Sequence, residues 1–101
     1  MHKLFIVIPI ADNDGRQYDS VLWDEIHVTL RNLYNGFTRT RVEGSWRDSD
    51  GAVFDDVSYR YEMLTDKPLG ELATLARHLG YCLNQRKMLI GQEPIDETRC
   101  V

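Results

Sequence analysis

The first ten residues constrain the fold more than any other part of the chain. Residues 3–10 read KLFIVIPI, a run of eight residues that is almost entirely apolar. In a strand, Leu4 and the three isoleucines would lie on one face, and Phe5, Val7 and Pro9 on the other. A strand that is apolar on both faces needs a cover on both faces. The chain has only 101 residues, so the question is what covers the second face.

Periodicity and turn signals divide the rest of the chain into five more elements. The expected elements are a helix over 21–34, strands over 37–46 and 53–64, a helix over 65–83 and a short strand over 87–92. Asn35-Gly36 is a typical helix end, and RDSDGA is a typical turn between two strands. Asp55-Asp56 is expected to mark a bulge or bend in the returning strand.

This order of strand, helix, strand, strand, helix and strand predicts a ferredoxin-like α+β fold. The expected sheet has four antiparallel strands, with both helices on one face. The domain is expected over residues 1–93, followed by a polar C-terminal tail over 94–101. Tyr59, Tyr61 and their alternate neighbours are expected to face the helices, because that set is the more apolar.

The second face of the sheet would then stay bare, with Arg60 and Glu62 beside the first strand. A second copy of the chain, the folded-back tail or a bound ligand could cover it. We expect a homodimer first, because closed two-fold dimers are the commonest assembly of soluble proteins.

Composition excludes several classes of partner. The formal net charge is −4 and the isoelectric point about 5.2, which argues against binding to duplex nucleic acid. The apolar run at the start is too short to span a membrane, and no signal-peptide cleavage site follows it. The chain is therefore expected to be cytoplasmic and not to bind membranes. Cys82 and Cys100 form neither a disulfide framework nor a metal motif, and no metal or cofactor is predicted.

Arginines and aromatic residues supply the candidate binding site. Arg39 and Arg41 are two residues apart and so lie on one face of a strand, while Arg60 lies on the strand that pairs with it. If the register permits, the three guanidinium groups converge on one sheet face, and in an acidic protein they would bind an anion. The predicted ligand-binding residues are Tyr18, Arg39, Arg41, Trp46, Arg47 and Arg60.

A structural alternative exists for Arg39, Arg41, Arg60 and Trp46, and also for Asp48 of the turn. The arginines could form cross-strand ion pairs with Glu43 and Glu62. Trp46 could pack at the end of the hairpin instead of stacking on a ligand ring. Asp48 could accept hydrogen bonds from backbone N–H groups of the turn.

The case for catalysis is weak. His27 and His78 lie in the two predicted helices, and the spacing supplies neither of them with an orienting partner for general base chemistry. The chain contains no nucleophile elbow, phosphate-binding loop or zinc-protease motif. No catalytic residue is predicted.

The hairpin sequence GSWRDSDGAVFDD resembles a group of small uncharacterised bacterial and phage proteins with a G-x-W-x-D-x-x-G hairpin. Gly44, Trp46, Asp48 and Gly51 match that pattern, and Asp56 follows it. The resemblance supports the ferredoxin-like organisation. On its phage side it implies one role, the sequestration of a host signalling nucleotide.

These features favour a small non-catalytic binding module, a homodimer that binds an anionic small molecule or a nucleotide. Two other classes stay open. One is a small cofactor-free enzyme of the dimeric ferredoxin-like type. The other is a protein–protein adaptor or an inhibitor of a host protein.

Overall fold

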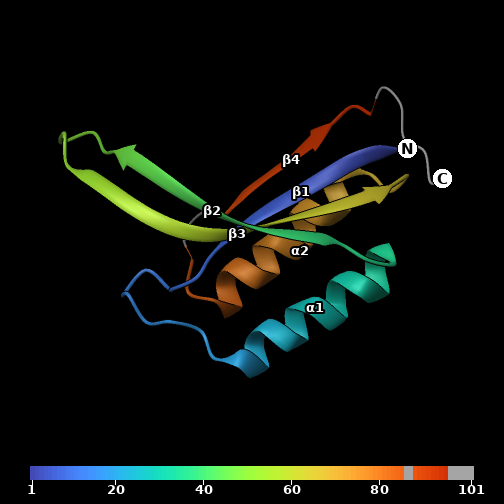
Figure 1. Cartoon of the computed structure of the whole chain (residues 1–101), viewed down its shortest axis with the longest axis horizontal. Coiled ribbons are helices and arrows are strands. Elements are labelled where there is room, and N and C mark those ends of the chain that lie inside the picture. Colours follow the sequence, from blue (N-terminus) through green and yellow to red (C-terminus); the bar gives the residue numbers. More distant parts are fainter. Residues whose placement is uncertain (86–87, 96–101) are drawn as a thin grey trace.

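The computed structural model describes residues 1–85 and 88–95 of the chain and has the expected α+β fold (Figure 1). Its elements are β1 (His2–Pro9), α1 (Ser20–Tyr34), β2 (Thr38–Arg47), β3 (Val53–Thr65), α2 (Leu69–Cys82) and β4 (Leu89–Glu93). Most of the expected C-terminal tail, including Cys100, lies outside the described residues.

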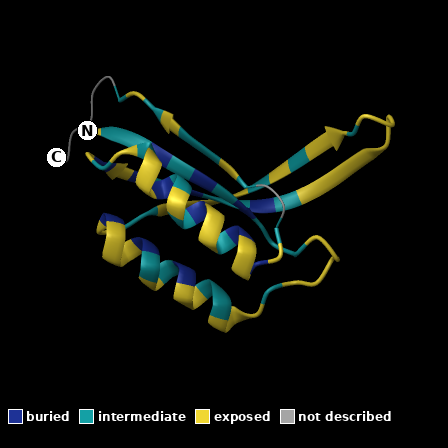
Figure 2. Ribbon diagram, turned by 180° about the vertical axis from the view of Figure 1, so that it is seen from behind, coloured by how far each residue is buried: buried dark blue, intermediate teal, exposed yellow. Residues whose placement is uncertain are grey.

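The four strands form one antiparallel sheet in the order β2-β3-β1-β4. β1 lies in the centre and pairs with β3 on one side and β4 on the other. Both helices cover the same face of the sheet (Figures 1 and 2). This confirms the ferredoxin-like topology that the order of elements predicts.

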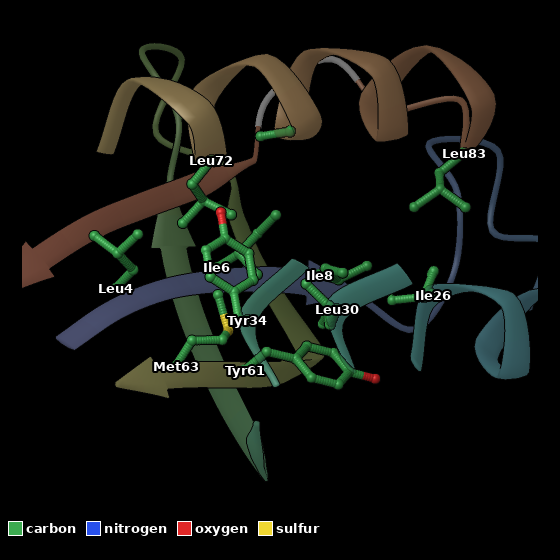
Figure 3. Packing of buried hydrophobic residues seen from close by; sticks show 11 residues of the cluster. Leu4, Ile6, Ile8, Ile26, Leu30, Tyr34, Tyr61, Met63, Leu72 and Leu83 are labelled. Atoms are coloured by element: carbon green, nitrogen blue, oxygen red, sulfur yellow. The ribbon is translucent and has the colours of Figure 1, made fainter. Parts of the chain in front are cut away.

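Alternation along β1 decides which face meets the helices. Leu4, Ile6 and Ile8 are fully buried, and so are Tyr61 and Met63 on β3. These side chains pack between the sheet and the helices (Figure 3). The helices contribute Ile26, Leu30, Tyr34, Leu72 and Ala76 to the same core. The predicted facing of β3 is therefore confirmed, and on β1 it is the even-numbered residues that meet the helices.

The helix ends follow from local chemistry. The Asp19 carboxylate accepts a hydrogen bond from the backbone N–H of Leu22, which caps the start of α1. Asn35 ends this helix in the left-handed conformation at φ 65°, and its N–H donates to the carbonyl of Arg31. None of the helices in the described residues is long and apolar enough to cross a membrane.

β2 and β3 extend beyond the rest of the sheet as a two-stranded arm. β1 pairs with β3 only over Ser58–Thr65, while the pairing of β2 with β3 continues to Arg47 and Val53. The arm projects from the body of the molecule and is mostly exposed (Figure 2). The pairing runs through Asp55 and Asp56 without an extra residue, so the expected bulge is absent from this hairpin.

Candidate functional site

The sheet face that the helices leave open carries a charged layer at its centre. Arg60 lies opposite Val7 on β1, and Glu62 lies opposite Phe5. The Arg60 guanidinium stacks 4.0 Å above the centroid of the Phe5 ring. The Arg60 side chain thus covers one of the apolar residues whose cover was in question.

Two carboxylates hold Arg60 in this position. Its Nε donates to Glu62 at 2.9 Å, and its Nη2 donates to Glu93 on β4 at 2.7 Å. Burial alone would lower the pKa of Arg60, but the hydrogen bonds to Glu93 and Glu62 outweigh it and raise that pKa. The Arg60 hydrogen bond also lowers the pKa of Glu62. Arg60 and Glu62 are therefore both charged, and the charge of the arginine is already paired within the protein.

A groove of about 740 Å³ lies on this face beside Arg60, toward the base of the arm. Its walls are mainly apolar, and four side chains add polar groups. The lining residues are Val7, Pro9, Val42, Glu43, Gly44, Trp46, Asp56, Ser58, Arg60, Met88 and Leu89. The groove has the size and mixed lining typical of small-molecule sites.

Trp46 forms the outer wall of this groove. The side chain is 58% exposed, and its indole N–H donates to Asp56 at 3.2 Å. The indole lies back over Gly44, where a Cβ would come within 2.6 Å of the indole nitrogen and of Asp56 Oδ1. Gly44 therefore leaves the space that Trp46 needs to lie along the strand and reach Asp56.

The turn that ends the arm is built by its own residues. Asp48 Oδ1 accepts the backbone N–H groups of Asp50 and Ala52, both at 2.9 Å. Gly51 adopts φ +85°, a conformation that residues with a Cβ rarely take. Asp48 thus has the structural role considered for it, and the G-x-W-x-D-x-x-G pattern is explained by hairpin geometry.

The expected convergence of three guanidinium groups is wrong. Arg39 lies opposite Tyr61 and Arg41 opposite Tyr59, on the helix side of the sheet. Arg60 lies opposite Thr40 and points to the open face. Odd-numbered residues of β2 pair with odd-numbered residues of β3, so the two sets of arginines cannot meet.

The other two predicted residues are also apart from the groove. Arg47 is exposed near the tip of the arm, opposite Val53, on the same face of β2 as Arg39. The Tyr18 hydroxyl donates to the carbonyl of Leu83 at 2.6 Å and accepts from Gln85 Nε2 at 2.7 Å. Tyr18 therefore ties the loop before α1 to the end of α2.

Of the six predicted residues, Trp46 and Arg60 line the groove. Val7 and Pro9 form the apolar floor of the groove with Leu89 of β4, but none of the three was among the predicted ligand-binding residues. The signal was present in the apolar odd-numbered positions of the first strand. It predicts an apolar surface, but which residues of β2 and β4 border that surface depends on the register.

The histidines lie away from the groove. His27 Nε2 is 2.8 Å from the Tyr61 hydroxyl, and His78 Nε2 is 3.7 Å from Cys82 Sγ. Within residues 1–85 and 88–95, no group of three or more His, Cys, Asp or Glu side chains could hold a metal ion. Among the described residues, the titratable side chains on the groove side of the sheet are Asp56 and the paired Arg60, because Glu43 is an odd-numbered residue of β2 and points to the helix side.

Comparison with known proteins finds similar folds but no matching protein family. No family model and no curated protein matches the chain. A phage SAM lyase in complex with S-methyl-5′-thioadenosine has a similar structure, with a TM-score of 0.67 and 12% sequence identity. That match covers 92% of this chain and 80% of the lyase chain.

A DUF3240 family protein from Shewanella baltica OS155 is also similar, with a TM-score of 0.52 and 20% identity over 99% of this chain and 96% of that one. At these identities, the likeness to both structures shows the α+β fold alone.

Proposed function

We propose that this protein is a small-molecule binding module that holds a nucleoside in the groove on the open face of the sheet. The observation that carries the proposal is the groove itself, an apolar trough of about 740 Å³ with the exposed indole of Trp46 along one wall. An indole offers a flat apolar surface on which a purine ring stacks, a contact worth about 1–3 kcal/mol.

The charges around the groove favour an uncharged or cationic ligand over a phosphate ester. Among the described residues, Arg60 is the one arginine in the lining, and Glu62 and Glu93 already accept its hydrogen bonds. Asp56 adds a carboxylate that repels phosphate and accepts hydrogen bonds from amino and hydroxyl groups. The groove therefore favours a nucleoside over the anion or nucleotide expected from the sequence.

The phage lyase of the same fold supports this ligand class, because its bound S-methyl-5′-thioadenosine is an uncharged nucleoside. Binding without turnover would let the protein sequester such a molecule in a host cell, the kind of role that the resemblance to phage proteins implies.

An enzyme that acts on a sulfonium compound is the second candidate. The neighbouring structure is a SAM lyase, and SAM carries a positively charged sulfur. The Asp56 carboxylate in the groove favours such a cation. Incubation with SAM, followed by chromatography for S-methyl-5′-thioadenosine, separates turnover from binding.

Calorimetric titration with S-methyl-5′-thioadenosine, adenosine and adenosine monophosphate tests the proposal. We expect the two nucleosides to bind the groove and the monophosphate to bind it about tenfold or more weakly, because its phosphate meets the Asp56 carboxylate. Trp46→Ala should weaken nucleoside binding by about tenfold or more through loss of stacking. Val53→Ala, which shortens another exposed side chain of the arm, should leave binding unchanged.

Gly44→Ala gives a second test that keeps the indole. The added Cβ would push Trp46 off the strand, so we expect weakened nucleoside binding with an intact fold by circular dichroism. Binding that is unchanged in both Trp46→Ala and Gly44→Ala would refute the groove as the site. Preferred binding of the monophosphate that is lost in Trp46→Ala would refute the ligand class, because that binding would take place in the groove.

A further inference from the structure

The helix side of β2 carries a second group of charges that the nucleoside groove does not use. β2 is an edge strand, and Arg39 and Arg41 on it are both exposed. They lie opposite Tyr61 and Tyr59, on the sheet face opposite to the groove.

Arg39 and Arg41 both lie beside the aromatic ring of Tyr59. Tyr59 is the direct cross-strand partner of Arg41, and the guanidinium of Arg39 lies 4.4 Å from the centroid of the same ring. Trp23 of α1 packs edge-on against Tyr59, with centroids 5.1 Å apart. The contact with Trp23 thus fixes the Tyr59 ring, and the guanidinium of Arg39 stacks on that ring.

α1 adds a third positive charge to this region. Arg31 lies one turn after His27, whose imidazole is bonded to the Tyr61 hydroxyl. The pKa of His27 is lowered by burial first and then by the charges of Arg39 and Arg31. Asp24, one turn before His27, opposes this effect as the weakest of the four influences. Arg31 and Arg39 therefore both lie near His27.

These arginines differ from Arg60 in their partners. Arg60 is paired with two carboxylates, whereas Arg31, Arg39 and Arg41 form no ion pair with a carboxylate within the described part of the chain. Glu43 lies on the same face of β2, two residues after Arg41, but forms no ion pair with it. Like charges held close together repel one another unless an anion lies between them.

We propose that Arg31, Arg39 and Arg41 form a basic cluster that binds the phosphate group of a small molecule. The planar guanidinium fork matches the oxygen geometry of phosphate and donates charge-assisted hydrogen bonds to it. The ligand is a small molecule because the acidic chain as a whole repels the long phosphate backbone of a nucleic acid. This site is independent of the nucleoside groove, from which the sheet separates it.

Titration of the full chain with inorganic pyrophosphate tests the cluster. Calorimetry at low ionic strength should show saturable binding, and the Nε–Hε signals of Arg39 and Arg41 should shift in nuclear magnetic resonance spectra. In Arg39→Gln/Arg41→Gln we expect binding to weaken by about tenfold or more, since two charge-assisted contacts are lost.

Arg47→Gln/Arg77→Gln is the matched control, because it removes the same charge from exposed positions outside the cluster. We expect this double variant, and Trp46→Ala in the groove, to bind pyrophosphate like the unaltered protein. Absence of saturable binding would overturn the proposal. An equal loss in both double variants would also overturn it, because the attraction would then be general. Loss of pyrophosphate binding in Trp46→Ala would assign the anion to the groove instead.

Discussion

His27 and Tyr61 form the polar contact between the helix layer and the sheet. Tyr61 is fully buried on β3, and its hydroxyl lies 2.8 Å from Nε2 of His27 on α1. The Phe37 ring packs beside both side chains, with centroids 5.0 Å from His27 and 5.2 Å from Tyr61. A positive charge on His27 would be partly buried and would lie near Arg39, so the fold favours the neutral imidazole.

This preference predicts a pH dependence of stability. Burial, together with Arg39 and Arg31, holds the pKa of His27 in the folded protein below the value of about 6.5 that it has when unfolded. The unfolded chain therefore binds more protons in this window, and the free energy of unfolding should rise with pH until about pH 6.5. Urea unfolding at a series of pH values measures this slope.

His27→Gln should flatten that slope between about pH 5 and pH 7, because glutamine does not titrate and can still bond the Tyr61 hydroxyl. His78→Gln is the control, since His78 is exposed on α2. A slope that persists in His27→Gln and disappears in His78→Gln would contradict the assignment.

At the scale of elements, β4 packs against β1 because Gly91 has no side chain where the Phe5 ring lies. Gly91 lies opposite Phe5, and a Cβ at Gly91 would come within 2.3 Å of Phe5 Cζ. The Phe5 ring occupies this space and supports the Arg60 guanidinium, which in turn bonds Glu93 near the end of β4. The packing of Phe5 and the ion pair between Arg60 and Glu93 thus hold the short edge strand β4 on the sheet.

Gly91→Ala should therefore destabilise the protein by about 1–3 kcal/mol, the usual cost of forcing a side chain into a filled space. Gly70→Ala, in the first turn of α2, meets no atom within 4 Å and should be neutral or stabilise by up to about 1 kcal/mol. Thermal unfolding of both variants measures the difference. If the two variants were equally stable, the position of the Phe5 ring would not depend on the absence of a side chain at Gly91.

The hairpin register explains why the elements could be predicted and the site could not. Alternation within each strand places Tyr61 and Met63 toward the helices from the sequence alone. Whether Arg39 shares a face with Arg60 depends on a shift of one residue between β2 and β3. The turn from Asp48 to Ala52 sets that register, through backbone and side-chain bonds that turn composition alone does not specify.

At the scale of the whole molecule, two features lie on the open face of the sheet. Its centre holds the charged layer, where Arg60 lies on Phe5 and Lys3 approaches Glu62 at 3.5 Å. Its side toward the arm holds the groove, in which Val7 lines the floor. An apolar sequence run predicts a need for cover but not its source, because long charged side chains can lie over apolar surface with their charges in water.

Apolar surface remains at the end of this face away from the groove. Leu64 on β3 is 46% exposed and lies opposite Lys3. A second copy of the chain would bury it, and burial of a leucine side chain contributes about 1.5–3 kcal/mol. We therefore propose that two copies pair across the open face as a homodimer, with the charged layers of both in contact.

Leu64→Glu tests this pairing, because it adds a negative charge beside Glu62 where the two copies would meet. We expect light scattering after size exclusion to report a dimer for the unaltered protein and a monomer for this variant. Val28→Glu places the same charge at a similarly exposed apolar residue, 49% exposed on α1, and should stay dimeric. If the unaltered protein is monomeric at all concentrations, the charged layer and the groove ligand are the whole cover of β1. If Val28→Glu alone dissociates the dimer, the interface lies on the helices instead.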